Sequence, residues 1–160
     1  MSARRFAADT SVSTDKSIAE VRATVRRYGA SEFAHVEGDR YAAVTFTMRG
    51  RRILFRLDMP DPKDKVFTET PTGRWARSDK QAEAAWEQAC RSRWRALALV
   101  IKAKLEAVEV GIVVFEDEFL ANTVMPGTSV TVAESIRPHM VAAHAEGSPQ
   151  PLLSYFGGKQ

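Results

Sequence analysis

The longest uninterrupted helical pattern in this chain covers residues 78–111. Within it, apolar residues such as Trp94 and Val108 recur every three or four positions, the spacing that places side chains on one face of an α-helix. Ser78 and Gln81 have the spacing of a capping box, and Gly111 supplies a stop. At 1.5 Å per residue, this helix would be roughly 48 Å long. A small domain is narrower than that, so we expect the helix to project, to bend or to lie along a partner.

Before this helix, the sequence predicts a shorter helix and a three-stranded antiparallel meander. Apolar residues at helical spacing cover residues 15–28, and Ser17 with Glu20 has the spacing of a capping box. The strands are predicted from alternating apolar and polar residues, with turns at Gly38 and Gly50. They are expected at residues 32–36, 41–48 and 53–59.

After the long helix, the sequence predicts a short hairpin and a last helix. The hairpin would pair residues 123–125 with 130–132, and Thr131 with Glu134 would cap a helix that ends at Gly147. Pro138 is expected to kink this helix or to split off its first turn. The predicted fold class is therefore α+β: an N-terminal helix, a three-stranded antiparallel β-meander, a long central helix, a short hairpin and a C-terminal helix.

Composition favours one soluble domain, because 44% of the 160 residues are hydrophobic and 27% are charged. We expect a flexible N-terminal arm over residues 1–12, one α+β domain over 13–147 and a C-terminal tail over 148–160. No apolar run reaches the roughly 20 residues of a membrane-spanning helix, so we expect a cytoplasmic protein with no membrane partner. The one cysteine, Cys90, has no internal disulfide partner and is expected in the core.

No catalytic or metal-binding motif stands out in the sequence. It has no phosphate-binding glycine loop, no nucleophile elbow and no Cys-x-x-Cys. His139 and His144 are five residues apart and do not share a helical face as metal ligands would. The acidic triplet at residues 116–118 is interpreted as a solvated face. We therefore expect no cofactor and no metal, and we favour a non-enzymatic function; a buried Glu116 or Glu118 in a cleft beside a histidine would favour an enzyme.

Positive charge is unevenly distributed along the chain. Residues 1–110 carry 21 of the 23 Lys and Arg and 15 of the 20 Asp and Glu, a net +6, whereas residues 111–160 carry a net −3. Such a surplus allows a basic face that meets phosphates, although a soluble domain with no such partner can have the same balance.

Eleven residues are candidates for binding nucleic acid. In the loop over residues 68–77, an aromatic ring between two arginines could stack on a base while the guanidinium groups reach phosphates, or the ring could instead close the loop onto the core. The other candidates are arginines at the hairpin tip and basic residues along the long helix. The full set is Arg49, Arg51 and Arg52 at the tip, Arg74, Trp75 and Arg77 in the loop, and Arg91, Arg93, Arg95, Lys102 and Lys104 on the helix.

Residues 92–124 (SRWRALALVIKAKLEAVEVGIVVFEDEFLANTV) resemble a family of uncharacterised proteins of tailed phages and prophages, as do YGASEF near the start and PLLSYFGG near the end. The resemblance implies a mobile-element context, in which small proteins commonly serve DNA replication, recombination or interference with host machinery. The predicted order of elements is also similar to the core of phage single-strand annealing proteins, although no signature motif of those proteins is present. In them, neighbouring subunits form a ring whose positive groove holds nucleic acid.

The leading hypothesis is therefore a phage-type, non-enzymatic DNA-metabolism protein that binds single-stranded DNA non-specifically and forms homo-oligomers through its long helix. Strand annealing would follow naturally from such binding. The alternative is a protein-binding module that inhibits or adapts a host or phage protein through the long helix and the apolar tail. Phosphate contacts weaken steeply as salt rises, whereas an apolar interface barely responds, so salt dependence separates the two hypotheses.

Overall fold

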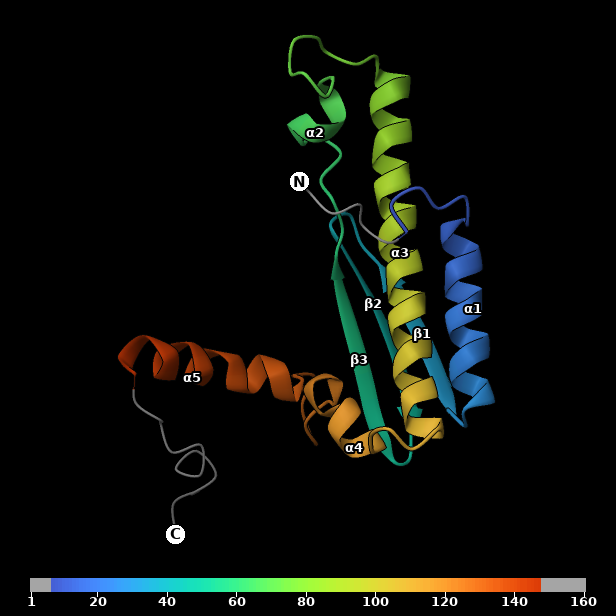
Figure 1. Cartoon of the computed structure of the whole chain (residues 1–160), viewed down its shortest axis with the longest axis vertical. Coiled ribbons are helices and arrows are strands. Elements are labelled where there is room, and N and C mark those ends of the chain that lie inside the picture. Colours follow the sequence, from blue (N-terminus) through green and yellow to red (C-terminus); the bar gives the residue numbers. More distant parts are fainter. Residues whose placement is uncertain (1–6, 148–160) are drawn as a thin grey trace.

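The computed structural model describes residues 7–147. The first half of the predicted N-terminal arm and the predicted C-terminal tail lie outside the described residues. The order of elements is the predicted α+β order (Figure 1). In chain order they are α1 (Thr14–Arg27), β1 (Glu32–Glu37), β2 (Tyr41–Met48), β3 (Arg51–Asp58), α2 (Lys65–Thr68), α3 (Asp79–Glu109), α4 (Phe115–Glu118), the 3-10 helix η1 (Leu120–Asn122) and α5 (Val132–Glu146).

Helix α1 begins one turn before its predicted cap. Ser13 has an extended backbone, and its hydroxyl accepts a hydrogen bond from the Lys16 N–H at 3.2 Å. Ser17, the predicted cap, is instead buried inside the helix, and its hydroxyl oxygen has no hydrogen-bond partner in the described part of the chain. The spacing of Ser17 and Glu20 therefore predicted the cap one turn too late in the sequence.

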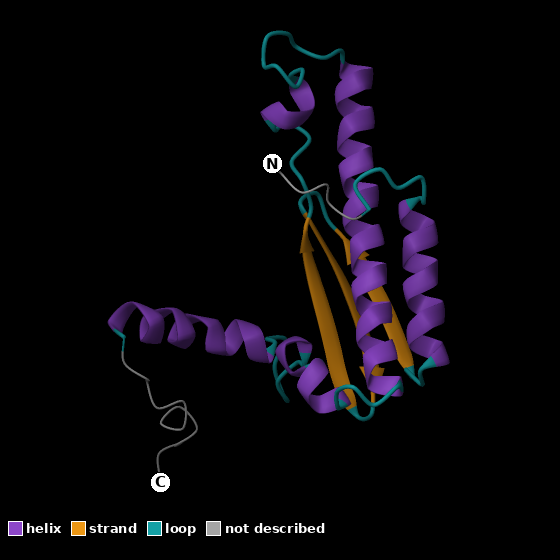
Figure 2. Ribbon diagram, viewed as in Figure 1, coloured by secondary structure: helices purple, strands orange, loops and turns teal. Residues whose placement is uncertain are grey.

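The three strands form the predicted antiparallel meander in the order β1-β2-β3. Arg49 and Gly50 join β2 to β3, and both have positive φ, at 50° and 72°. Two such residues in a row fit the twist of a two-residue hairpin. Figure 2 shows α1 and α3 covering one face of the sheet, which makes the core a layer between helices and strands.

The core confirms the predicted alternation along the strands. Val44 and Phe46 of β2 and Ile53 of β3 are buried against Trp94 and Ile101 of α3. The other face of the sheet carries a second, small buried cluster of Ala43, Leu54 and Val124.

Helix α3 is one continuous helix of 31 residues and extends beyond the end of the sheet, as Figure 1 shows. Its capping box joins Ser78 and Gln81 as predicted. The segment before it, which lacked a predicted element, contains the short helix α2. Phe67 of α2 is buried, so this segment is anchored beside the projecting half of α3.

The segment after α3 forms the predicted short hairpin and also joins the edge of the sheet. Thr123 pairs with Ile53 of β3, and the Val124 N–H donates to the Arg52 carbonyl oxygen at 2.8 Å, so this stretch lies along the edge of the sheet. The Met125 N–H donates to the Val130 carbonyl oxygen and the Val132 N–H to the Thr123 carbonyl oxygen, both at 2.9 Å, and Val124 bridges Thr131 between them. Residues 123–125 therefore pair with residues 130–132 as predicted.

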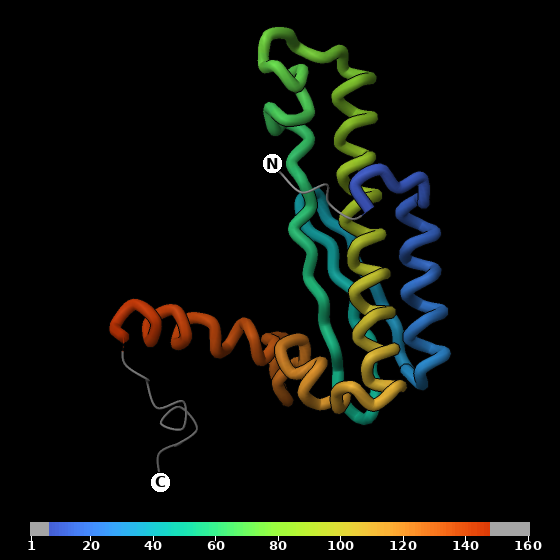
Figure 3. The backbone as a smooth tube through the Cα atoms, in the orientation of Figure 1, coloured from blue at the N-terminus to red at the C-terminus, as the bar shows by residue number. Residues whose placement is uncertain are grey.

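Helix α5 begins at the predicted capping box of Thr131 and Glu134 and ends at Gly147. Pro138 lies inside the helix without dividing it. Figure 3 shows α5 leaving the body of the protein sideways. None of the helices within residues 7–147 is long and apolar enough to cross a membrane.

Candidate binding surfaces

The described part of the chain is electrically balanced. Of the 23 Lys and Arg, only Arg4, Arg5 and Lys159 lie outside residues 7–147, so this part carries 20 basic and 20 acidic residues. The surplus of +3 therefore belongs to the two ends of the chain. A folded part with no net charge provides no general attraction for phosphates, so binding of nucleic acid would depend on a local group of cations.

Six of the predicted nucleic-acid residues are engaged within the chain. Their partners are carboxylates or backbone carbonyl oxygens, so each cation already has a structural contact. The contacts are Arg51 with Glu116 at 3.0 Å, Arg77 with the Val66 and Phe67 carbonyl oxygens at 3.2 Å, Arg91 with Glu87 at 3.5 Å, Arg93 with the Asp58 carbonyl oxygen, Arg95 with Glu20, and Lys104 with Glu118 at 2.7 Å.

The other predicted residues are more available but are dispersed. The Arg49 guanidinium lies 5.2 Å from the centre of the Phe115 ring, and Arg52 makes one long hydrogen bond, 3.4 Å, to a threonine hydroxyl. Arg74 and Lys102 are exposed and have no partner among residues 7–147. The hairpin tip and the loop before α3 lie at opposite ends of the molecule (Figure 1), so the structure does not unite the eleven residues in one surface.

Trp75 is the most accessible aromatic side chain of the described residues. It is 74% exposed, so it does not close its loop onto the core. The loop itself is ordered by the Thr70 N–H, which donates to the Trp75 carbonyl oxygen at 2.8 Å. Arg74 beside it is also exposed. This pair keeps the stacking and phosphate chemistry that the sequence predicts.

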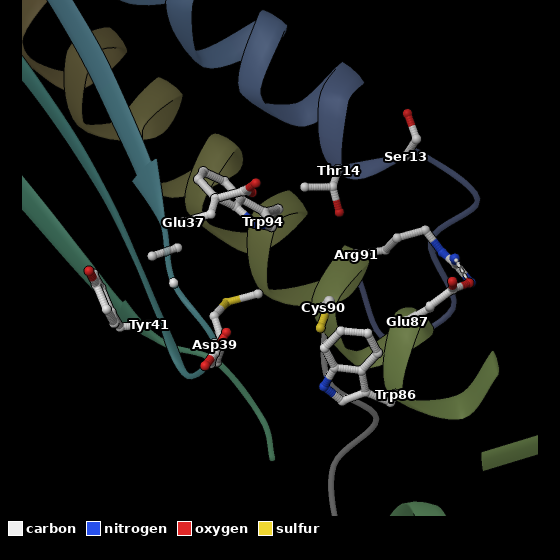
Figure 4. Close-up of a pocket in the computed structure, with 13 residues that line it drawn as sticks. Ser13, Thr14, Glu37, Asp39, Tyr41, Trp86, Glu87, Cys90, Arg91 and Trp94 are labelled. Atoms are coloured by element: carbon white, nitrogen blue, oxygen red, sulfur yellow. Dashed lines mark ion pairs between the residues drawn. The ribbon is translucent and has the colours of Figure 1, made fainter. Parts of the chain in front are cut away.

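A cavity of about 390 Å³ lies between α3 and the turn that joins β1 to β2. Figure 4 shows Trp86, Cys90 and Trp94 along α3, facing the turn that carries Asp39. The Trp86 indole N–H donates to the Pro60 carbonyl oxygen at 2.8 Å, which fixes this wall. The volume is that of a small-molecule site, and the wall is mainly apolar.

The residues that line this cavity do not form a reactive site, and we interpret the cavity as imperfect packing at the edge of the core. Burial raises the pKa of the Cys90 thiol, so the thiolate nucleophile is disfavoured. Arg91 at the rim is paired with Glu87, as the dashed line in Figure 4 marks. The remaining carboxylates at the rim, Glu37 and Asp39, are exposed. No buried polar group converges on a position that a substrate would occupy.

The acidic triplet has structural partners. Glu116 is paired with Arg51 and Glu118 with Lys104, and neither lies beside a histidine in a cleft. Within residues 7–147, no three His, Cys, Asp or Glu side chains gather closely enough to hold a metal ion. The arrangement that would favour an enzyme is therefore not observed in this part of the chain.

The outer face of α3, which points away from the sheet, is the largest uncharged surface of the helix. Residues at three- and four-residue spacing along the centre of this face are small or apolar, whereas Arg93 and Glu106 border it. Val100 is 46% exposed and Val110 is 60% exposed. We call this surface the outer stripe; it consists of Ala85, Ala89, Ser92, Ala96, Leu99, Val100, Ala103, Ala107 and Val110.

One end of the outer stripe forms the floor of a groove of about 430 Å³. Ala85, Ala89 and Ala96 of α3 line it together with Val66 and Phe67 of α2, and Ala8, Asp64 and Arg93 also border it. Small side chains on the floor and larger ones at the side leave space for a bulky apolar side chain. The groove therefore suits a helix that packs against α3.

The sequence pattern predicted the inner face of α3, which contains Trp94 and Val108, but did not predict the outer stripe. The inner residues are large, so their periodicity is obvious, whereas alanines carry little hydrophobic signal. The informative signal was the absence of charge at positions 85, 89, 92, 96, 99, 103, 107 and 110 in a chain with 27% charged residues. A helix with one solvated face should carry charge there.

Comparisons with known protein families, with curated proteins and with solved structures found no match to this chain.

Proposed function

We propose that this protein is a non-enzymatic protein-binding module, and that the outer stripe of α3 is its binding surface. The observation that carries the proposal is a helix of 31 residues with an apolar face toward the sheet and an outer stripe without charge, which is exposed at Val100, Ala103 and Val110. At Ser92 the chain's own N-terminal segment meets the stripe, because the Ser92 hydroxyl donates to the Ala8 carbonyl oxygen at 3.0 Å. A surface helix of a monomeric protein normally has a charged outer face. An uncharged outer face is typical of a helix that packs on both sides.

Physical chemistry favours a helix as the bound element. Alanines let a second helix approach to about 8 Å between axes, at which distance van der Waals contact is extensive. The stripe over residues 85–110 is roughly 38 Å long, or about seven helical turns. Because it contains no charge, binding removes no ion from water, and the apolar area buried is available to stabilise the complex at about 25 cal/mol per Å² before the cost of association.

Photocrosslinking tests this proposal. Benzoylphenylalanine at position 103, inside the outer stripe, should give discrete adducts with a partner protein in a bacterial lysate. The matched control places the probe at Ala84, which is exposed on the same helix but lies off the stripe. Adducts at position 103 should disappear when Ala96→Glu is added. Equal adduct formation at positions 103 and 84 would contradict the proposal.

A second candidate function is binding of single-stranded nucleic acid by the loop before α3. The observation that favours it is the exposed pair of Arg74 and Trp75, which offers a stacking ring beside an unpaired guanidinium. Stacking of one base on an aromatic ring contributes about 1–3 kcal/mol. Phage-type DNA metabolism and strand annealing, expected from the sequence, depend on this candidate.

Fluorescence anisotropy of a labelled single-stranded oligonucleotide tests whether the loop before α3 binds nucleic acid. Binding at about 50 mM salt should weaken by orders of magnitude at about 200 mM. The Arg74→Ala and Trp75→Ala double variant should lose binding. Replacement of Arg91, Arg93 and Arg95 is the control, because these residues are engaged within the chain. No binding by the natural protein at either salt concentration would exclude the nucleic-acid candidate and leave the protein-binding proposal in place.

A further inference from the structure

We infer that the helix that docks on the outer stripe is α5 of a second copy of this chain. The contact would be head-to-tail: each copy offers its α5 to one neighbour and its outer stripe to another. This inference rests on the proposed function of the outer stripe and names its partner.

Among residues 7–147, helix α5 finds little of the packing that usually stabilises a helix. None of the residues Val132–Glu146 is buried. Its first turn is held by the capping box and by Arg56, whose Nε donates to Glu134 Oε1 at 2.7 Å. Isolated helices of this length are marginal in water, and Pro138 removes one further hydrogen bond. We therefore expect α5 to acquire packing from outside its own chain.

The apolar side chains of α5 are large enough to fill the groove on α3. Ile136, Met140 and Ala143 follow one another at helical spacing, and no charged residue lies among them on that face. Met140 is 42% exposed. Methionine adapts well to irregular apolar gaps. The larger side chains on α5 and the alanines on the floor of the groove are therefore complementary in size, with Asp64 and Arg93 beside that floor.

The two surfaces of one molecule are not in contact. Helix α5 leaves the opposite end of the body from the groove, as Figure 1 shows, and its contacts with the rest of the described chain are made with η1 and the edge of the sheet. A contact between two copies of α5 would leave the groove empty, and a contact between two copies of α3 would leave α5 without packing. Only the head-to-tail arrangement covers both surfaces, and such an interface produces rings or filaments.

Sedimentation velocity of the full chain between about 1 and 100 µM tests the inference. The natural protein should form species larger than a dimer as concentration rises. Ala96→Glu in the groove and Met140→Glu on α5 should each weaken self-association by about tenfold or more, because each would bury a carboxylate without a partner. The matched controls, Ala84→Glu on α3 and Ala145→Glu on the opposite face of α5, should associate as the natural protein does.

Mixing the two blocked variants gives the sharpest outcome. Ala96→Glu retains a natural α5 and Met140→Glu retains a natural groove, so a mixture should form a one-to-one dimer and nothing larger. Both substituted residues are exposed, and urea unfolding should show that each variant keeps the stability of the natural chain.

Three results would overturn the inference. If Ala96→Glu abolishes association and Met140→Glu does not, α3 pairs with another α3, and the proposed function of the outer stripe survives. If the natural protein stays monomeric to about 100 µM, a second copy is not the partner, and photocrosslinking at position 103 decides the proposed function separately. If the mixed variants form no dimer, the head-to-tail contact does not exist.

Discussion

Helices α3 and α5 have the same local signals and different surroundings. Both begin with a capping box, Ser78 with Gln81 and Thr131 with Glu134, and a glycine with positive φ follows each. Yet α3 buries six residues, including Ile101, whereas α5 buries none. Local chemistry therefore defines where a helix begins and ends, but contacts with other elements decide whether it belongs to the core or is available to a partner.

The difference arises from the surface that each helix meets. Helix α3 lies across a three-stranded sheet whose inner face presents Phe46 and Phe55, so large residues such as Trp94 lose most of their contact with water. Burying such a side chain stabilises the fold by about 1.5–3 kcal/mol. Helix α5 leaves the edge of the same sheet and meets no second layer, so its apolar side chains remain accessible.

The largest expected effect is a loss of core packing in α3. Ile101→Ala removes a fully buried side chain and should lower the free energy of unfolding by about 2–5 kcal/mol. Met140→Ala in α5 should change it by less than about 0.5 kcal/mol in the monomer. Urea unfolding at low protein concentration measures both, and Val100→Ala, on the exposed side of α3, is the neighbouring control. Equal losses for Ile101→Ala and Met140→Ala would show that α5 is packed in the monomer.

Removing the two helix caps should have smaller and unequal effects. Thr131→Ala takes away the hydroxyl that accepts from the Glu134 N–H, and a cap contributes about 0.5–2 kcal/mol. Because α5 has little other support, we expect its amide protons to exchange about three- to thirtyfold faster. Ser78→Ala should increase exchange only in the first turn of α3. Hydrogen exchange measures the effect of both substitutions. An unchanged exchange rate of the α5 amides in Thr131→Ala would mean that contacts other than the cap stabilise this helix.

The attachment of α5 should depend on pH. Hydrogen bonding to the Thr131 backbone N–H, together with the Arg56 guanidinium, holds the pKa of Glu134 below its usual value. A carboxyl group with a lowered folded-state pKa stabilises the fold above its unfolded pKa of about 4.3, and this contribution is lost as pH falls through the lower, folded-state value. The helical content of α5, measured by its Cα secondary chemical shifts, should therefore fall as the pH drops through that folded-state pKa, while α3 remains helical.

Glu134→Gln is the control for this pH dependence. Glutamine keeps the geometry of the capping box but cannot titrate. The helical content of the first turn of α5 should then no longer fall as the pH drops. A transition of unchanged midpoint in the variant would assign the dependence to another group.

The smallest expected effect concerns an ion pair between α3 and α1. Arg95 is paired with Glu20, and both side chains are partly exposed. Such pairs contribute about 0–1 kcal/mol, so Arg95→Gln should lower the free energy of unfolding by at most about 1 kcal/mol. Lys102→Gln, which removes an exposed cation with no partner among residues 7–147, should have no effect. Urea unfolding at low and high salt distinguishes the two, because only the ion pair is screened.

Much of the fold was predictable because its signals are local. Alternation in β2, the two positive-φ residues at the β2–β3 turn and the capping boxes of α3 and α5 depend on neighbouring residues only. The cap of α1 was wrong because Ser17 has the capping-box spacing with Glu20 that Ser13 lacks, and only the structure shows that Ser17 is buried inside the helix. The short hairpin after α3 was predictable from its turn, but its pairing with the edge of β3, some seventy positions earlier in the chain, was not.

The candidate site was less predictable than the fold. The sequence shows that cations exist on α3 but not that Arg93 and Arg95 are engaged by Asp58 and Glu20. Charge partners come from elements distant in sequence, so their pairing is a property of the tertiary structure. In contrast, the sequence left two alternatives for Trp75, which could either be exposed for stacking or close its loop onto the core. The structure shows that it is exposed.

The sequence by itself determined the order of the main helices and strands, the ends of α3 and α5, the inner face of the sheet and the charge balance, because these follow from local conformational preference, periodicity and residue counts. Only the tertiary structure decided which cations remain available, that α3 covers the sheet on one side alone, and that α5 stands apart. The physical reason is that burial and ion pairing depend on which surfaces meet, and residues distant in the chain supply those surfaces.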